Sequence, residues 1–197
     1  KIIENEILCV VGESGSGKSM MARSIMGLLP RRLKITGGEI KFEDRLLNHL
    51  TPKQFQKIRG LSIAMIFQEP MSALNPLHSI GKQIEEVLLL HTSLNKTERR
   101  QRILEMLSSV HLPDPQHVIQ SYPHEISGGQ RQRAMIAMAL ILEPKILIAD
   151  EPTTALDVTT QAQILNLIRD LQREKQTGVI FITHDFGVVA EIADRIA

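Results

Sequence analysis

Eight residues near the start of the sequence have the types and the spacing that bind phosphate. They follow the pattern G-x-x-x-x-G-K-[ST] and are Gly12, Glu13, Ser14, Gly15, Ser16, Gly17, Lys18 and Ser19. A glycine-rich backbone can approach an anion closely and turn its N–H groups toward it, and a helix that begins there adds its positive end. The Lys18 ammonium suits the outer phosphates, and the Ser19 hydroxyl suits Mg²⁺. The stretch therefore predicts a phosphate-binding loop.

The segments on either side give this loop the context that the pattern requires. Residues 7–11 form a short apolar run typical of a buried strand, and residues 20–29 contain no proline and have helical character. A glycine-rich turn could match the pattern by chance. The order of strand, glycine loop and helix argues against that alternative.

Two further apolar runs end at side chains that could face a phosphate. Residues 62–67 are a predicted strand that ends at Gln68, and residues 179–183 are another that ends at His184. Open α/β sheets gather ligand groups at the carboxyl ends of their strands. There a Gln68 carbonyl could reach a metal ion or a water, and His184 could donate a hydrogen bond to a phosphate. Taken alone, either side chain could also be an ordinary solvated or structural group.

Two carboxylates follow the most apolar of these runs. Residues 145–149 predict a strand buried in a parallel sheet, and Asp150 and Glu151 come directly after it. An acid at this edge can hold Mg²⁺, and its neighbour can polarise a water for attack on the terminal phosphate. Acids also end strands without any such role, so the phosphate-binding loop carries much of this interpretation.

A second possible anion site lies in the middle of the chain. Ser127 is a predicted helix N-cap, two glycines follow it, and residues 131–142 are strongly helix-forming. A capped helix start with glycines can bind an anion. An ordinary capped helix is the alternative.

The remaining pattern divides the chain into a sheet and a helical part. Residues 39–47 predict a small hairpin, and Thr51-Pro52 predicts a helix start. From residue 71 to residue 141 apolar residues recur at helical spacing and strand runs are absent. We expect an α/β domain whose core lobe comprises residues 1–70 and 142–197, with residues 71–141 inserted as a helical subdomain.

Composition narrows the functional classes. The 197 residues carry a formal net charge of +1, and only 3% are aromatic, so the sequence has neither the basic face nor the stacking platform of a nucleic-acid-binding protein. The single cysteine, Cys9, falls in a predicted strand and is expected in the core, which fits a reducing compartment. No apolar run is long enough to span a bilayer. The first and last residues fall almost inside predicted elements, so we expect a chain truncated at both ends.

Taken together, the motifs resemble those of ABC-transporter ATPase domains over nearly the whole chain. The matching elements occur in the family's order, and they are the loop at 12–19, Gln68, Ser127-Gly128-Gly129-Gln130, Ile148-Ala149-Asp150-Glu151, Ala155-Leu156-Asp157 and His184. The Ser-Gly-Gly-Gln element separates this family from other P-loop proteins. Ile126 stands where the family usually has Leu. The resemblance implies a P-loop NTPase core with a mainly parallel sheet, a small antiparallel hairpin and an inserted helical subdomain.

The resemblance also implies which residues serve ATP. The ATP contacts would be the loop at 12–19, Met20 and Gln68. The Mg²⁺ ligands would be Ser19, Gln68 and Asp150. The catalytic groups would be Glu151 as general base, His184 as γ-phosphate sensor and Lys18. The family's adenine-stacking aromatic has no match within these residues.

A second ATPase subunit is implied as a partner. In the family, Ser127, Gly128, Gly129 and Gln130 contact ATP bound to the opposite subunit, and Asp157 lies at the subunit junction. Two anion sites for one triphosphate agree with such head-to-tail pairing.

The sequence in and around these motifs, at residues 67–76, 122–125 and 149–159, resembles that of bacterial importers of dipeptides, oligopeptides, glutathione and nickel. Membrane permease subunits and, indirectly, a solute-binding protein would be partners, at the cytoplasmic face of the bacterial inner membrane. Met71, Leu74 and Leu77 are candidate permease contacts. The alternatives are a soluble ABC ATPase of DNA repair or translation, and a regulatory module that binds nucleotide without hydrolysing it.

Overall fold

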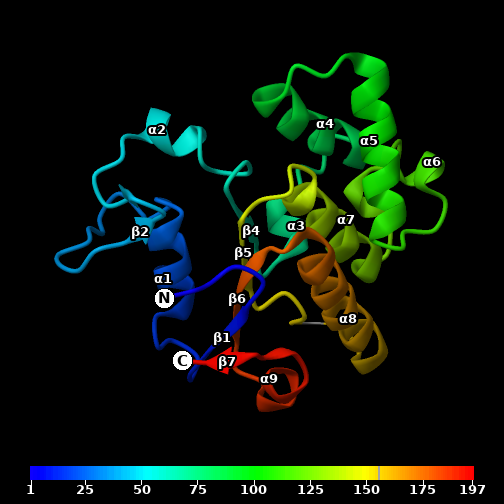
Figure 1. The fold of residues 1–197 in the computed structure, drawn as a ribbon. Coiled ribbons are helices and arrows are strands. Elements are labelled where there is room, and N and C mark those ends of the chain that lie inside the picture. The colour runs from blue at the N-terminus through cyan, green and yellow to red at the C-terminus, as the bar shows by residue number, and fades with distance from the viewer. Residues whose placement is uncertain (155) are drawn as a thin grey trace.

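A parallel sheet forms the centre of the molecule. The computed structural model describes residues 1–154 and 156–197, so Ala155 lies outside the described residues. In the described part, five parallel strands have the order β4-β5-β6-β1-β7 (Figure 1). They are β1 (Ile7–Val11), β4 (Ile63–Ile66), β5 (Ile146–Asp150), β6 (Gly178–Thr183) and β7 (Arg195–Ile196). Because all of them run in one direction, the residues that follow them meet at one edge of the sheet.

The two faces of the sheet carry different layers. Successive side chains of a strand point to opposite faces, so in β5 Leu147 joins one hydrophobic cluster and Ile148 joins the other. The Ile148 cluster holds α1 (Lys18–Ile25), the hairpin β2 (Lys41–Phe42) with β3 (Arg45–Leu46), and α2 (Pro52–Gln56). The predicted hairpin is thus present, although its strands are shorter than expected.

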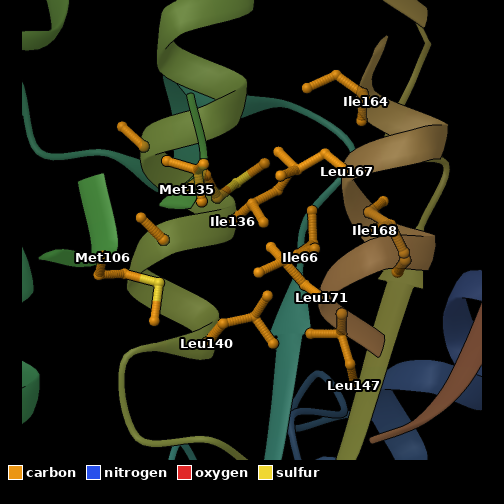
Figure 2. Packing of buried hydrophobic residues seen from close by; sticks show 14 of the residues in the cluster. Ile66, Met106, Met135, Ile136, Leu140, Leu147, Ile164, Leu167, Ile168 and Leu171 are labelled. Carbon is orange, nitrogen blue, oxygen red and sulfur yellow. The ribbon is translucent and has the colours of Figure 1, made fainter. Parts of the chain in front are cut away.

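The Leu147 cluster is the larger one. It packs the sheet against α8 (Val158–Lys175), α9 (Phe186–Ile192) and the helices between β4 and β5. Figure 2 shows Ile66 and Leu147 between the apolar sides of α7 and α8. Continuous apolar strands such as β5 are therefore explained by burial on both faces.

Between β4 and β5, every regular element is helical, as predicted. These elements are α3 (Pro70–Ala73), α4 (Ile80–His91), α5 (Lys96–Ser109), α6 (Pro115–Val118), the 3₁₀ turn η1 (Pro123–Glu125) and α7 (Gly128–Leu140). Asn95 and Glu98 form the predicted capping box of α5. The apolar face of α5, with Ile103, Met106 and Leu107, is buried. Local sequence signals therefore define this segment well.

The helix after the glycine loop is shorter than predicted. We expected it to reach Leu29, but α1 ends at Ile25. Gly27 has a φ of 61°, and a Cβ there would lie 2.4 Å from the ring of Phe55. The guanidinium of Arg59 donates to the carbonyls of Met26 (2.8 Å) and Gly27 (2.7 Å). A left-handed glycine and a distant arginine thus end the helix.

Two features of the far edge of the sheet complete the fold. The strand β7 was not predicted, and it pairs with β1 through Leu8 opposite Arg195 and Cys9 opposite Ile196. Cys9 is fully buried, as predicted, and burial, with a smaller effect of the Asp194 charge, raises the pKa of its thiol to about 11. Within the described ranges, no helix has the length and apolar content needed to cross a membrane.

Candidate nucleotide site

The glycine loop between β1 and α1 has the geometry of an anion nest. Gly15 and Gly17 have φ values of 83° and 98°, which side chains rarely adopt. Gly17 is the N-cap of α1, and in the described residues no side chain caps this helix and no acid occupies its first turn. Its N–H groups are thus left for an anionic ligand. Glycine is required at these positions by backbone conformation.

Lys18 directs its charge back into this loop. Its Nζ donates to the carbonyls of Gly12 (2.6 Å) and Glu13 (2.8 Å) and lies 3.3 Å from Ser16 Oγ. The side chain is buried although the loop itself is exposed. A compact ammonium on a flexible stem can exchange these carbonyls for phosphate oxygens with little movement.

Ser19 and Asp150 meet at the start of α1. Ser19 Oγ donates to Asp150 Oδ1 at 2.9 Å, which joins the loop to the end of β5. Asp150 is only 4% exposed. Burial raises the pKa of its carboxyl and the nearby Glu151 charge adds to this, while the Ser19 hydrogen bond opposes it. A cation beside Asp150 would relieve the cost of keeping this carboxylate ionised.

Glu151 is the centre of a second group of polar contacts. Its Oε2 accepts hydrogen bonds from Gln68 Nε2 and from Thr154 Oγ1, both at 3.0 Å. Its Oε1 lies 3.2 Å from Nδ1 of His184. The side chain is 13% exposed, and the backbone has a φ of 48°, a strained conformation that is found at functional sites. The structure thus brings Gln68, Glu151 and His184 together, as the strand-edge argument predicted.

Thr154 was missed by the sequence analysis. Its hydroxyl shares Oε2 of Glu151 with Gln68, so it helps to orient the carboxylate. The only local signal is its position three residues after Glu151, within the turn that leaves β5. Threonine is too common in turns for that position to have been informative.

The oxygen groups of this edge fit Mg²⁺ better than a metal held by protein alone. In residues 1–154 and 156–197, no three His, Cys, Asp or Glu side chains are grouped so that they could hold a metal. Mg²⁺ in phosphate sites usually takes one or two carboxylates and completes its shell with phosphate oxygens and water. The Ser19 hydroxyl and the Asp150 carboxylate, beside the glycine loop, are a donor set of that kind.

The second predicted anion site is a capped and exposed helix end. Ser127 Oγ accepts from the Gln130 amide at 3.2 Å, and Gln130 Oε1 accepts from the Ser127 amide at 2.8 Å. This is a capping box, and it confirms Ser127 as the N-cap of α7. Ser127 and Gly128 are both exposed. The start of α7 therefore offers N–H groups to solvent.

The structure does not bring the two anion sites together. The helices α1 and α7 belong to the clusters on opposite faces of the sheet. Among the described residues, no hydrogen bond or ion pair joins Ser127–Gln130 to the glycine loop. The sequence-predicted ATP residues thus form two groups in one chain.

Asp157 lies next to the second group. It is the N-cap of α8, where Thr160 donates to it through its amide (3.0 Å) and its hydroxyl (2.7 Å). The hydrogen bonds from Thr160 lower the pKa of this carboxyl. A Cβ on Gly129 would lie 3.0 Å from Thr160 Cγ2, so α7 and α8 begin side by side (Figure 1). Thr160 therefore connects the Asp157 cap to the start of α7.

One predicted partner contact is wrong. Met71 is 49% exposed and Leu77 is 80% exposed, so both are available to a partner. Leu74 is 4% exposed and belongs to the larger hydrophobic cluster. Its role is packing inside the molecule, and its apolar character alone did not distinguish the two uses.

The arrangement of glycine loop, strand-edge acids and Ser-Gly-Gly-Gln helix now has a match among known families. The sequence profile described as ABC transporter matches residues 1–154. The chain belongs to the ABC transporter family.

Relatives within the ABC transporter family include proteins named for peptide transport. The chain is 54% identical to the dipeptide transport ATP-binding protein DppD of Bacillus subtilis, over all of this chain and 59% of that protein. It is 53% identical to the oligopeptide transport ATP-binding protein OppD of Bacillus subtilis, over 98% of this chain and 54% of that protein. The chain thus spans little more than half the length of these relatives.

Solved ABC structures confirm the predicted fold. The dimeric structure of the ATP-binding cassette MJ0796, in a post-hydrolysis state bound to ADP and Pi, has a TM-score of 0.86 and 36% identity, covering all of this chain and 82% of that one. The structure of cbiO1 from Clostridium perfringens has a TM-score of 0.84 and 29% identity, with 100% and 74% covered. The fold is the P-loop ABC ATPase fold.

Proposed function

We propose that this chain is the ATP-hydrolysing domain of an ABC importer for peptides or related small solutes. The observation that carries the proposal is Glu151, held by Gln68, Thr154 and His184 beside the Ser19–Asp150 pair and the glycine loop. Hydrolysis of a bound triphosphate requires a carboxylate that can hold a metal ion and a second carboxylate oriented toward a water, and Asp150 and Glu151 are suited to these two roles. In this proposal residues 1–70 and 142–197 form the core lobe and residues 71–141 a helical subdomain.

In the proposed mechanism, each group acts on the phosphates from a fixed position. The loop amides and Lys18 bind the β- and γ-phosphates, and Met20 lies in the first turn of α1 behind them. Ser19, Asp150 and Gln68 would hold Mg²⁺, and the ion would neutralise charge on the triphosphate.

Glu151 then performs the proton transfer. Its carboxylate exchanges the amide of Gln68 for a water and takes a proton from that water as the water oxygen bonds to the γ-phosphorus. The bond between the γ-phosphorus and the bridging oxygen breaks, so ADP and inorganic phosphate are released. His184, which lies at the end of β6 with Nδ1 3.2 Å from Glu151 Oε1, would donate a hydrogen bond to the γ-phosphate. Thr154 keeps the carboxylate oriented while Gln68 is exchanged.

A second ATPase subunit, identical or paralogous, completes the proposed site. The start of α7 and the glycine loop are separate in one chain, so two head-to-tail chains can place Ser127, Gly128, Gly129 and Gln130 over each other's nucleotide. Asp157, whose partner Thr160 lies beside Gly129, would then lie at the subunit junction. The dimeric MJ0796 cassette supports this pairing.

The transport role rests on the relatives. Their names specify dipeptide and oligopeptide transport, which favours an importer over ATPases of DNA repair or translation. The proposed assembly lies at the cytoplasmic face of the bacterial inner membrane, with permease subunits and a solute-binding protein. Exposed Met71 and Leu77 are the proposed permease contacts, since adaptable apolar side chains suit such a surface.

The test is Glu151→Gln in the complete subunit. We expect phosphate release to fall by about 10²- to 10⁴-fold, as for loss of a general base, while ATP binding is retained and an ATP-bound dimer accumulates. Glu143→Gln is the matched control because Glu143 also has a positive φ (52°) but pairs with Arg102 and Lys175 on the surface. Normal turnover in Glu151→Gln would refute the assignment of the base. Absence of ATP hydrolysis in the unmodified subunit would favour a regulatory module.

A further inference from the structure

Arg131 joins the first turn of α7 to the loop that precedes it. Side chains on a helix point back toward its N-terminus, and Arg131 lies four residues after Ser127. Its Nη1 donates to the carbonyl of Ile126 at 2.8 Å and to that of Pro123 at 3.1 Å. Ile126 is the residue directly before the N-cap. The guanidinium therefore fixes the backbone that leads into Ser127.

The loop that Arg131 contacts is also stabilised by interactions within residues 122–125. The Tyr122 amide donates to Glu125 Oε2 at 2.7 Å, which closes the turn η1. The rings of Tyr122 and His124 stack with centroids 5.7 Å apart. This turn is a preformed unit, and Arg131 connects the unit to the helix. Movement of the turn would therefore move Ser127 unless the arginine is released.

The positive charge of Arg131 lies near the N-terminus of α7, where the helix dipole is unfavourable for a cation. A cation in the first turn opposes the positive end of the helix dipole. In the described residues, no acid in that turn compensates. The other terminal nitrogen, Nη2, lies 3.9 Å from the point that a Cβ on exposed Gly128 would occupy. An anion at the start of α7 would turn this unfavourable arrangement into a favourable one.

We propose that Arg131 is a positioning residue that holds Ser127–Gln130 in place for the ATP of the opposite subunit and adds positive charge beneath Gly128. The inference rests on the proposed function and names a further residue of that same site. The inference predicts different effects on two properties of the complete protein, ATP-dependent dimerisation and nucleotide binding by a single subunit. Loss of Arg131 weakens the closed, ATP-bound dimer, but it leaves nucleotide binding by one subunit unchanged because the glycine loop is untouched.

The experiment compares Arg131→Gln, Arg131→Lys and Arg102→Gln in the complete subunit. Arg102 is the matched control because, among the described residues, its side chain pairs with surface Glu143, at the far end of the helical segment. Nucleotide affinity is titrated at a protein concentration that keeps subunits apart. ATP-dependent dimerisation is measured by sedimentation in the Glu151→Gln background, and kcat and KM by phosphate release.

We expect Arg131→Gln to weaken ATP-dependent dimerisation and raise KM by about ten-fold, in the range for lost hydrogen bonds to a charged group, with unchanged single-subunit affinity. Arg131→Lys should recover part of the loss, because it keeps the charge but lacks the planar guanidinium, whose second terminal nitrogen lies near Gly128. Arg102→Gln should match the unmodified protein in all three measurements.

Two results would overturn the inference while leaving the proposed function intact. One is Arg131→Gln with normal dimerisation and normal KM. The other is a loss that parallels a lowered melting temperature and is shared equally by Arg131→Lys, which would make Arg131 purely structural. If the unmodified protein neither dimerises with ATP nor hydrolyses it, the proposed function fails, and the inference fails with it.

Discussion

The starts of α1 and α7 use the same parts in two different ways. Each helix has glycine at its N-cap or in the position directly after it, lacks an acid in its first turn within the described residues, and places a cation on carbonyls of the loop that precedes it. At α1 that cation is Lys18, on the carbonyls of Gly12 and Glu13. At α7 it is Arg131, on the carbonyls of Pro123 and Ile126.

The two ends differ in what the ligand must displace. The N-cap of α1 is a left-handed glycine without a side-chain cap, and a lysine can leave its carbonyls to follow a phosphate. The start of α7 is closed by the Ser127–Gln130 capping box, and its arginine donates to two loop carbonyls from one nitrogen, Nη1. In the proposed function, the first end therefore adapts to a bound nucleotide. The second end is capped and exposed, which suits a ligand that another molecule already holds.

The largest expected effect comes from removing the mobile cation. Lys18→Ala should lower the ATP affinity of a single subunit by about 10- to 100-fold, in the range for lost hydrogen bonds between charged groups. Equilibrium titration with a fluorescent ATP analogue measures it. An unchanged affinity would mean that the two ends do not differ as described, and would remove the glycine loop from the site.

Ser127→Ala should separate the two ends. The helix loses its cap, so the free energy of unfolding should fall by about 1 kcal/mol. ATP affinity of the single subunit should stay the same, whereas ATP-dependent dimerisation should weaken. Urea unfolding and sedimentation measure the two parts. A loss of single-subunit affinity would show that α7 contacts nucleotide within its own chain.

The same glycine substitution should have opposite signs at the two ends. Gly17→Ala forces a side chain into a φ of 98°, so it should destabilise the protein by about 1–2 kcal/mol. Gly128 is helical and a Cβ there would make only an ordinary contact, 3.9 Å from Arg131 Nη2, so Gly128→Ala should stabilise the protein by about 0.5–1 kcal/mol. Denaturant unfolding of both variants tests this. Equal signs would contradict the described backbone difference.

The smallest expected effect concerns the buried carboxylate beside α1. Because burial raises the pKa of Asp150 in the folded state, the folded protein holds that proton more tightly than the unfolded chain. Stability should therefore fall as the pH rises from the ordinary aspartate pKa to the raised one. Asp150→Asn should lack this fall and be more stable at neutral pH without nucleotide. The measurement is the free energy of unfolding of both proteins at several pH values across that range. The same pH dependence in the unmodified protein and in Asp150→Asn would contradict the expectation.

Much of the site was predictable because its functional residues form short motifs in the sequence. The glycine loop, the acids after β5 and the cap at Ser127 each depend on local backbone geometry, and strand direction then brings Gln68 and His184 to Glu151. What the sequence did not predict depends on distant partners. The early end of α1 requires Phe55 and Arg59, and the burial of Leu74 requires the whole cluster around it.

The strand β7 and the contacts of Thr154 and Arg131 were not predicted either, because the strand is short and both residue types are common. The strand β7 has only two paired residues, too few for any period to appear. The Thr154 hydroxyl and the Arg131 guanidinium are common groups whose importance comes only from the atoms they meet, Glu151 Oε2 and two loop carbonyls. Contact, not residue type, identifies them.

The sealed thiol in β1 has a practical use. Cys9 is inaccessible and, with its raised pKa, stays protonated at neutral pH, so it will not react with maleimides or nitroxide reagents. Within these 197 residues no other cysteine competes for a label. A spin label attached to a new cysteine on the exposed part of α5 would thus give one signal from these residues, and its separation from the same label on a second copy would test the proposed ATP-dependent dimerisation.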